Sequence, residues 1–216
     1  MTHCLRRTLR DLALATPIAV AVTLAHAGAF EDYFKAVELN DAGAVERLIQ
    51  RGFDVNARDE KGQAALFLVL RDGSFKVAEA LLRQPQLDID APNAVGETAL
   101  MMAALKGHTD WARRLLERGA KLEKTGWTPL HYAATGPEAA LVAMLLDKGA
   151  SINARSPNGS TPLMMAARYG SEDSARLLLA RGADTGLRNE RNLSAADFAR
   201  SAGRDALATQ LERGVR

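Results

Sequence analysis

The sequence predicts a mainly α-helical solenoid built from about six similar units, counting a cap at each end. A nine-residue phrase, Gly126 to Ala134, returns 33 residues later at Gly159 to Ala167, and both copies read G-x-T-P-L-x-x-A-A. A period of this length is typical of proteins that stack one supersecondary unit many times. Extending the period along the chain places a glycine or asparagine at the opening of five units: Gly62, Gly96, Gly126, Gly159 and Asn192.

Two further positions recur once the period is extended back to Ala29. Seven residues after each opening the side chain is alanine, with Val69 as the one larger residue, and a small side chain permits close helix packing. Nineteen residues after each opening a leucine follows in all six units: Leu48, Leu81, Leu115, Leu145, Leu178 and Leu211.

The first half of each unit is predicted to be a short helix. Thr128 and Thr161 stand where a side-chain oxygen caps a helix N-terminus. Pro129 and Pro162 follow directly, and proline suits the first turn because no hydrogen-bonded amide is lost there.

A tight turn and a second, antiparallel helix are predicted next. Eleven residues after the openings come Gly73, Gly107, Gly170 and Gly203, at a turn that favours positive φ. The second helix carries leucine pairs such as Leu115-Leu116 and ends at a glycine suited to a left-handed cap. These terminal glycines are Gly52, Gly119, Gly149 and Gly182.

The phrase resembles the ankyrin repeat. Thr128 to Ala133 contains T-P-L-H-x-A in full, which is that family's signature at a 33-residue period. Residues 55–57 and 152–154 are similar to the family's Val-Asn-Ala segment, which leads into a β-hairpin finger. The resemblance implies a solenoid of helix-turn-helix units joined by such fingers, whose concave face binds other proteins.

We expect one ankyrin-repeat domain over residues 28–216. Its repeats are predicted near 29–61, 62–95, 96–125, 126–158, 159–191 and 192–214. The first and last depart from the signature, as terminal repeats do when they have a neighbour on one side only. Three residues fewer before Gly126 predict a shortened finger there.

Residues 1–27 read as a signal peptide cleaved after Ala27. Three arginines precede an uncharged stretch that ends in Ala25-His26-Ala27, an A-x-A cleavage pattern. The stretch is shorter than the roughly 20 residues that span a bilayer, so we expect no stable membrane insertion after cleavage. Arg6-Arg7 leaves twin-arginine export open beside the favoured Sec route. The expected location is periplasmic or secreted, which makes this an exported bacterial ankyrin protein.

Cleavage changes the chemistry that remains. It removes Cys4, three arginines and one aspartate, which leaves 25 Lys+Arg against 25 Asp+Glu. A chain without cysteine has no thiolate nucleophile, and a neutral chain lacks the electrostatic basis for nucleic-acid binding. We therefore expect no nucleic-acid partner.

No motif of an enzyme, metal site or cofactor site is present. The sequence has no H-E-x-x-H, no G-x-S-x-G and no phosphate-binding glycine loop. His108 and His131 fall where ankyrin repeats carry structural histidines, which the resemblance implies bond to neighbouring backbone. We expect no catalytic residues, no cofactor and no metal.

Paired methionines keep a second function open. Met101-Met102 and Met164-Met165 occupy the helix positions of His131-Tyr132, where core packing is favoured. Thioethers also bind copper, and some exported ankyrin proteins are associated with peroxide defence. The alternative function is an accessory factor in oxidative or copper stress.

The predicted partner-binding residues lie on the fingers and on the exposed side of the first helices. Trp127, Arg168 and Tyr169 are the expected anchors, since these residue types dominate interface energetics. Alternatively, the shortened finger lets Trp127 fold back onto its neighbours. The full set is Arg58, Lys61, Val95, Glu97, Leu105, Trp127, Arg155, Arg168, Tyr169 and Arg191. The sequence thus predicts a monomeric, non-enzymatic protein-interaction module in the periplasm, with an unidentified protein partner.

Overall fold

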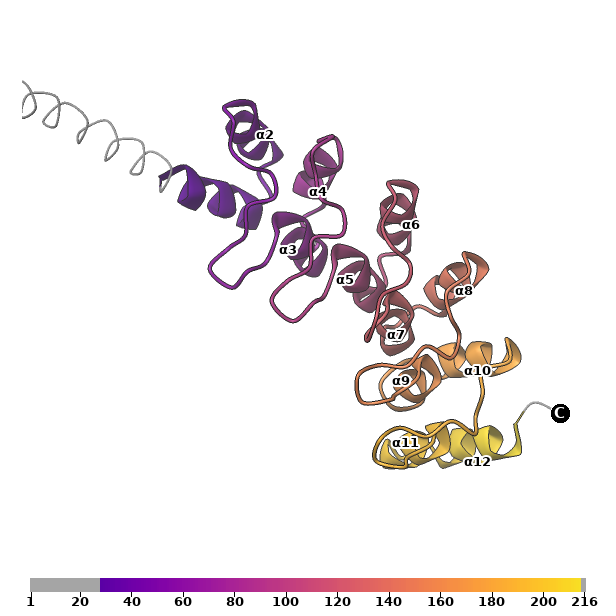
Figure 1. The fold of residues 1–216 in the computed structure, drawn as a ribbon. Coiled ribbons are helices and arrows are strands. Elements are labelled where there is room, and N and C mark those ends of the chain that lie inside the picture. Colours follow the sequence, from indigo (N-terminus) through magenta and orange to yellow (C-terminus); the bar gives the residue numbers. More distant parts are fainter. Residues whose placement is uncertain (1–27, 215–216) are drawn as a thin grey trace, which may run out of the picture.

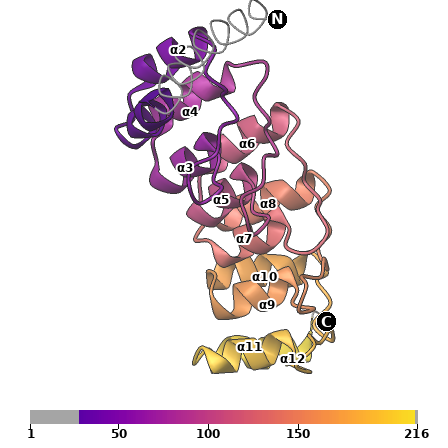
Figure 2. The ribbon, with the colours of Figure 1, turned by 60° about the vertical axis from the view of Figure 1, so that its left-hand side comes forward.

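The computed structural model describes residues 28–214, so the predicted signal peptide and its cleavage site lie outside the described residues. This part of the chain is a curved stack of short helices (Figures 1 and 2). The prediction of a mainly α-helical solenoid is confirmed. Across these residues, no helix combines the length and the apolar character that a bilayer-crossing helix needs.

The helices follow one another in pairs. The first described helix covers residues 28–38. The others are α2 (Ala42–Gln50), α3 (Ala65–Asp72), α4 (Phe75–Leu82), α5 (Ala99–Lys106), α6 (Thr109–Glu117), α7 (Pro129–Thr135), α8 (Ala139–Asp147), α9 (Pro162–Arg168), α10 (Glu172–Ala180), α11 (Ala195–Ser201) and α12 (Asp205–Arg213).

Two rows of helices form the curve. Helices α3, α5, α7, α9 and α11 pack in series along the inner row, and α2, α4, α6, α8, α10 and α12 make the outer row. The loops between units project from the inner row, on the inside of the bend in Figure 1. Because each unit packs against its sequence neighbours, the inner row and its loops form one continuous concave face.

The recurring residues of the sequence build the core between the rows. The small residue of each first helix is buried at Ala103, Ala133, Ala166 and Ala199, and so is Val69. The recurring leucine of each second helix is buried in every unit except the first, where Leu48 is only partly covered. Side-chain size and apolar character at two positions of the period therefore account for the stacking.

The turn between the two helices of a unit has a glycine or asparagine for one of two reasons, a left-handed backbone or a close contact with a neighbouring repeat. Gly73, Gly107 and Gly203 have φ between 72° and 74°, and Asn40 takes the same place in the first unit with φ 53°. The prediction of positive φ is wrong at Gly170, which is not left-handed. Glycine is required there because a Cβ atom would lie 1.9 Å from the carbonyl oxygen of Ala134.

The fingers are closed by tight turns rather than by paired strands. In four of them a backbone N–H bonds the carbonyl four residues ahead, as from Asp59 to Gln63 (2.9 Å) and from Asn189 to Leu193 (3.0 Å). Between residues 28 and 214 the one isolated β-bridge joins Arg58 and Ala64, so the expected β-hairpins are reduced to turns. The finger over residues 121–126 lacks this closing bond, in line with its predicted shortening.

Candidate protein-binding surface

A groove opens on the concave face near the C-terminal end of the solenoid. We call it the C-terminal groove; its volume is about 300 Å³, and it lies between the last two fingers and helices α9 and α11. Its lining contains four of the ten predicted partner-binding residues. The lining residues are Trp127, Asn158, Ser160, Met165, Arg168, Tyr169, Asn189, Arg191, Leu193 and Phe198.

Trp127 forms one wall of this groove. Its indole is half-buried and lies edge-on to the His131 ring, with 5.3 Å between ring centroids. The ring therefore folds onto its own repeat, as the alternative interpretation expects, and it also lines the groove, where its role as an anchor stays a prediction. A ring held in this way offers contact area at little entropic cost.

His131 has the structural role that the sequence predicts. Its Nδ1 accepts the backbone N–H of Thr128 (3.2 Å), and its Nε2 lies 3.0 Å from the carbonyl oxygen of Ser160 in the next repeat. This bonding assigns the proton to Nε2, which donates to that carbonyl. Burial lowers the pKa of His131, which favours the neutral ring that this hydrogen bonding between repeats requires.

Arg168 and Tyr169 form the second wall. The Arg168 guanidinium lies over the Tyr169 ring, 5.1 Å from its centroid, and Tyr169 is 54% exposed. Among the described residues no carboxylate pairs with Arg168. The pair thus combines a cation free of internal partners with an exposed aromatic ring.

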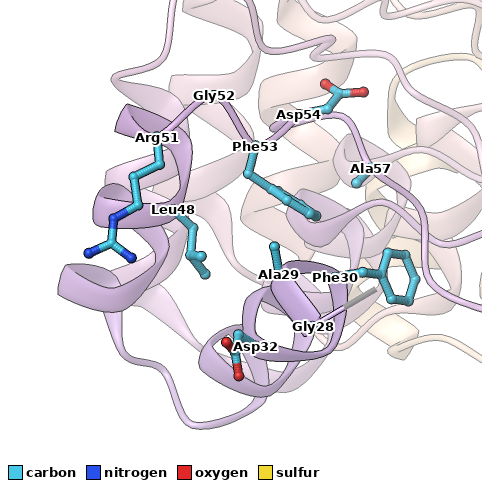
Figure 3. A pocket seen from close by; sticks show the side chains of 10 residues that line it. All are labelled: Gly28, Ala29, Phe30, Asp32, Leu48, Arg51, Gly52, Phe53, Asp54 and Ala57. Carbon is cyan, nitrogen blue, oxygen red and sulfur yellow. The ribbon is translucent and has the colours of Figure 1, made fainter. Parts of the chain in front are cut away.

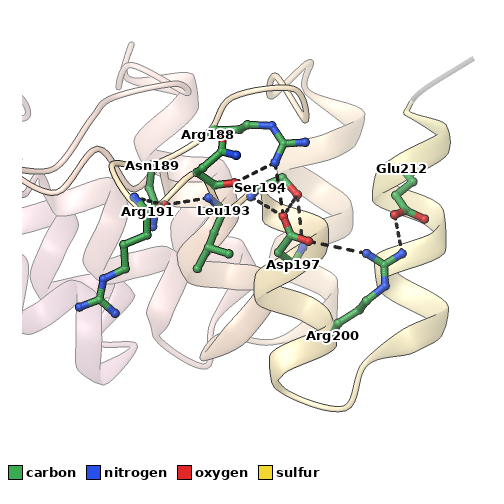
Figure 4. A network of polar contacts seen from close by, with 9 residues as sticks. Arg188, Asn189, Arg191, Leu193, Ser194, Asp197, Arg200 and Glu212 are labelled. Atoms are coloured by element: carbon green, nitrogen blue, oxygen red, sulfur yellow. Dashed lines mark hydrogen bonds and ion pairs between the residues drawn. The ribbon is translucent and has the colours of Figure 1, made fainter.

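Arg191 stands at the tip of the last finger. Asn189 shapes that tip, since its Oδ1 accepts the backbone N–H groups of Arg191 and Leu193, each at 3.0 Å. Figure 4 shows the Arg191 side chain pointing away from the neighbouring ion pairs of Asp197. The finger thereby holds a second cation beside the groove.

A polar network closes the solenoid behind this finger (Figure 4). Asp197 accepts bonds from Ser194 and lies 3.7 Å from Arg188 and 3.8 Å from Arg200. The bonds from Ser194 hold the pKa of Asp197 below its usual range. Arg200 also pairs with Glu212 of the last helix, which ties α12 to α11.

A smaller hollow of about 120 Å³ lies at the other end of the concave face, and we call it the N-terminal hollow. It contains the predicted residue Lys61. Arg71 is paired there with Asp72 at 2.7 Å, and this hydrogen bond lowers the pKa of Asp72. The lining residues are Phe34, Val37, Glu38, Asp59, Lys61, Gln63, Leu68, Val69, Arg71, Asp72 and Ser74.

The other five predicted residues lie outside both hollows. Arg58 donates to the carbonyls of Gly62 and Pro92, and Arg155 donates to the carbonyl of Arg188 at 2.7 Å, so both guanidiniums join neighbouring fingers.

Glu97 is likewise committed to internal bonds, since it accepts from Asn93 and from the Tyr132 hydroxyl, each at 2.7 Å. Val95 is 79% exposed at a finger tip, and Leu105 is half-buried at the end of α5.

Sequence reasoning missed an aromatic cluster on the outer row of helices. Phe75 stacks on Trp111 at 5.3 Å and meets His108 edge-on at 4.9 Å, while Arg114 lies 4.4 Å from the Trp111 centroid. The sequence could have predicted this cluster, because Phe75 and Trp111 both lie near the starts of predicted second helices in neighbouring units.

A pocket at the N-terminal end was also not anticipated. Its volume is about 690 Å³, and Figure 3 shows the rings of Phe30 and Phe53 beside it, with Leu48. Leu48 is the recurring leucine that remains partly uncovered in the first unit.

The methionine pairs pack in the core. Met101 and Met164 are almost fully buried and Met102 is buried, whereas Met165 is half-buried in the C-terminal groove. Over residues 28–214, no group of three or more His, Cys, Asp or Glu side chains is arranged to hold a metal ion.

Comparisons with known proteins agree with this geometry. A family model described as ankyrin repeats in three copies matches residues 34–125 and 121–189. The B-cell lymphoma 3 protein homolog of Mus musculus is 34% identical over 164 residues, which cover 73% of this chain and 37% of that protein. The nuclear factor NF-kappa-B p105 subunit of Gallus gallus is 32% identical over 161 residues, 71% of this chain and 16% of that protein.

A solved structure is similar over a larger share of its own length. One chain of the complex between the Bd0816 predatory endopeptidase from Bdellovibrio bacteriovorus and the immunity protein Bd3460 matches with a TM-score of 0.71 and 30% identity. The match covers 84% of this chain and 97% of that chain. By contrast, this chain spans only 37% and 16% of the length of the two curated relatives. Since the family model matches well over half of the sequence, the chain belongs to the ankyrin-repeat family.

Proposed function

We propose that this protein is a non-enzymatic interaction module that binds a protein partner through its concave face, centred on the C-terminal groove. The observation that carries the proposal is the convergence of Trp127, Arg168, Tyr169 and Arg191 on one groove. Tryptophan, tyrosine and arginine are enriched among the residues that contribute most to protein binding.

The non-enzymatic part of the proposal is supported by how the titratable groups are used. His131 is buried and committed to two repeats, and Glu97 is bonded to a tyrosine and an asparagine. The Thr128 hydroxyl lies 2.9 Å from Nδ1 of His131, but both side chains are buried at the start of α7 and offer no open nucleophile–base pair to a substrate.

The location that we propose is the periplasm. Its support is the basic, apolar and A-x-A pattern of residues 1–27. A related consideration is the similarity to one chain of a complex between an endopeptidase and an immunity protein. We propose by analogy that the partner is an enzyme exported to the same compartment.

Site-specific photo-crosslinking in intact cells tests the binding surface. A benzophenone amino acid placed at Leu193 or Tyr169 is expected to yield a discrete crosslinked protein. The same label at Phe75, on the outer row, serves as the matched control. Crosslinks confined to Phe75, or equal at all three sites, contradict the proposed surface.

Cell fractionation and mass spectrometry of the mature N-terminus test the location. The expected result is a periplasmic protein that begins at Gly28. A cytoplasmic protein that retains residues 1–27 contradicts export, while the crosslinking result stands independently of it.

A further inference from the structure

The charge of the C-terminal groove is one-sided. Its ten lining residues include two cations, Arg168 and Arg191, and no carboxylate. Glu190 precedes Arg191 in the finger, but within the described chain no ion pair joins the two. The groove therefore presents positive charge that the protein itself does not neutralise, although residues 28–216 as a whole carry equal numbers of acidic and basic side chains.

The hydrogen-bonding groups of the groove are one-sided as well. The Oδ1 of Asn158 accepts from Ser160 and Ser156, and the Oδ1 of Asn189 accepts from the last finger. Through residues 28–214, no hydrogen bond engages the Nδ2 group of either asparagine or the indole N–H of Trp127. The side-chain carbonyl oxygens of both asparagines are thus occupied, while their N–H groups and the indole N–H remain available as donors.

An acceptor inside the groove is occupied in the same way. The carbonyl oxygen of Ser160 bonds Nε2 of His131 at 3.0 Å and the backbone N–H of Ser156 at 2.9 Å. A ligand that fits this arrangement brings acceptors, and carboxylates supply them together with the complementary charge.

The floor of the groove is apolar. Met165 and Phe198 lie at equivalent places on α9 and α11, and Leu193 is 37% exposed beside them. Trp127 closes this floor on one side. Such a surface accommodates one aliphatic or aromatic side chain between the two arginines.

From these observations we infer that the C-terminal groove binds an extended acidic segment of the partner, with carboxylates at Arg168 and Arg191 and an apolar side chain on the floor between them. This inference rests on the proposed function, because it takes the groove as the docking surface. It names what the groove selects: a polypeptide that is rich in Asp or Glu around an apolar anchor. The finger arginines Arg58 and Arg155 differ from this pair, because their guanidiniums donate to backbone carbonyls.

Selection of random ten-residue peptides by mRNA display on the purified protein tests the inference. We expect the selected pool to be enriched in Asp and Glu around one aliphatic or aromatic residue. The double variant R168E/R191E is expected to bind those peptides at least roughly tenfold more weakly, because two charge-assisted contacts become repulsive. Circular dichroism verifies that the variant remains folded.

Arg71→Glu is the matched control, since Arg71 occupies the same repeat position in the N-terminal hollow. It is expected to leave peptide binding unchanged. A selected pool without acidic enrichment, no selected peptides, or an equal loss in R71E overturns the inference. So does tighter binding of a single-stranded oligonucleotide that is lost in R168E/R191E, because the groove then selects phosphates.

The crosslinking experiment and the peptide selection test different statements, so a negative result in one leaves the other open. If the cell crosslinks at Leu193 and Tyr169 persist but the peptides show no acidic preference, the proposed function stands and the partner chemistry is wrong. If the crosslinks are absent from the groove, the proposed function itself is contradicted.

Discussion

The two hollows of the concave face occupy matching positions of the repeat but differ in charge. Arg71 and Arg168 each lie nine residues after the opening of their units. The next residue is Asp72 in one and Tyr169 in the other, so the first arginine is neutralised at 2.7 Å while the second lies over an aromatic ring. The residue beside a shared arginine is therefore one source of the difference in charge between the two hollows.

The finger residues repeat the same contrast. Asp59 and Asn189 both stand three residues before a unit opening, and the Oδ1 of each accepts two backbone N–H groups of its finger. The turn is the same, but Asp59 adds a carboxylate to the N-terminal hollow and Asn189 adds none to the C-terminal groove. The comparison shows that the scaffold fixes where side chains lie, while positions without a packing role set their chemistry.

The largest expected effect concerns the glycines that follow the two arginine positions in sequence, Gly73 after Arg71-Asp72 and Gly170 after Arg168-Tyr169. Gly170→Ala is expected to lower the free energy of unfolding by about 3 kcal/mol or more, because its Cβ would overlap the Ala134 carbonyl. Gly73→Ala meets no neighbouring atom and is expected to cost about 1 kcal/mol through its left-handed φ. Denaturant unfolding measures the free energy of unfolding of both variants. Equal losses would contradict the close contact between Gly170 and the Ala134 carbonyl as the reason for glycine at this position.

The next largest effect is expected from removing His131, the ring against which Trp127 packs. The unit that contains the N-terminal hollow has Phe67 at this position instead of a histidine. His131→Ala is expected to lower the free energy of unfolding by about 2 kcal/mol, because its hydrogen bonds to Thr128 and Ser160 and the packing of a buried ring are lost. Urea unfolding at pH 7.5 measures it. A change below about 0.5 kcal/mol would contradict the structural role.

The same histidine predicts a dependence of stability on pH. Burial lowers the pKa of His131, so the unfolded chain binds the proton more readily. Stability is therefore complete above about pH 6.5, the ordinary histidine pKa, and declines as the pH falls below it. H131A is expected to flatten this decline relative to the wild type, and H108A serves as the comparison because the pKa of His108 is also lowered. An unchanged slope in H131A contradicts this assignment.

Transferring the acidic residue between the hollows has a smaller expected effect. Tyr169→Asp gives Arg168 the neighbour that Arg71 has, so binding of the display-selected acidic peptides is expected to fall roughly tenfold. The reciprocal D72Y is expected to leave that binding unchanged. Fluorescence anisotropy measures both affinities, and Y169F separates loss of the ring from loss of the hydroxyl.

The smallest expected effect comes from removing the pair in the N-terminal hollow. Arg71→Ala is expected to change the free energy of unfolding by less than about 1 kcal/mol, because Arg71 and Asp72 are both partly exposed and solvent screens them. Thermal unfolding at low and high salt measures it. A larger loss would mean that this pair holds the repeat together.

Most of the fold follows from the period of the sequence. Leucine and alanine at fixed places predict which faces are buried, and Asn40 and Asn192 adopt the positive φ of the glycines that they replace. Gly170 is the exception. It occupies the same place in its unit as the left-handed glycines, but glycine is needed there because of close contact with the Ala134 carbonyl and not because of the turn geometry. The strand pairing of the fingers depends on hydrogen-bond geometry that no residue pattern specifies.

The candidate site was less predictable. Position in the repeat places Trp127, Arg168, Tyr169 and Arg191 on the concave face, and they meet in one groove. The same reasoning cannot tell them from Arg58 and Arg155, whose guanidiniums reach carbonyls of the neighbouring finger. Which exposed arginines have internal partners depends on contacts about 30 residues apart in sequence, and these become visible only in three dimensions.

The two ends of the solenoid also differ, with a consequence for assembly. The N-terminal end has an apolar pocket beside Phe30 and Phe53, whereas the C-terminal end carries the partly exposed ion pairs of Asp197, Arg200 and Glu212. A head-to-tail filament needs two complementary ends, because each added subunit must offer the surface that the last one recognises. Across residues 28–214 the two ends offer different chemistry, so a contact between copies through these ends would place apolar rings against ion pairs.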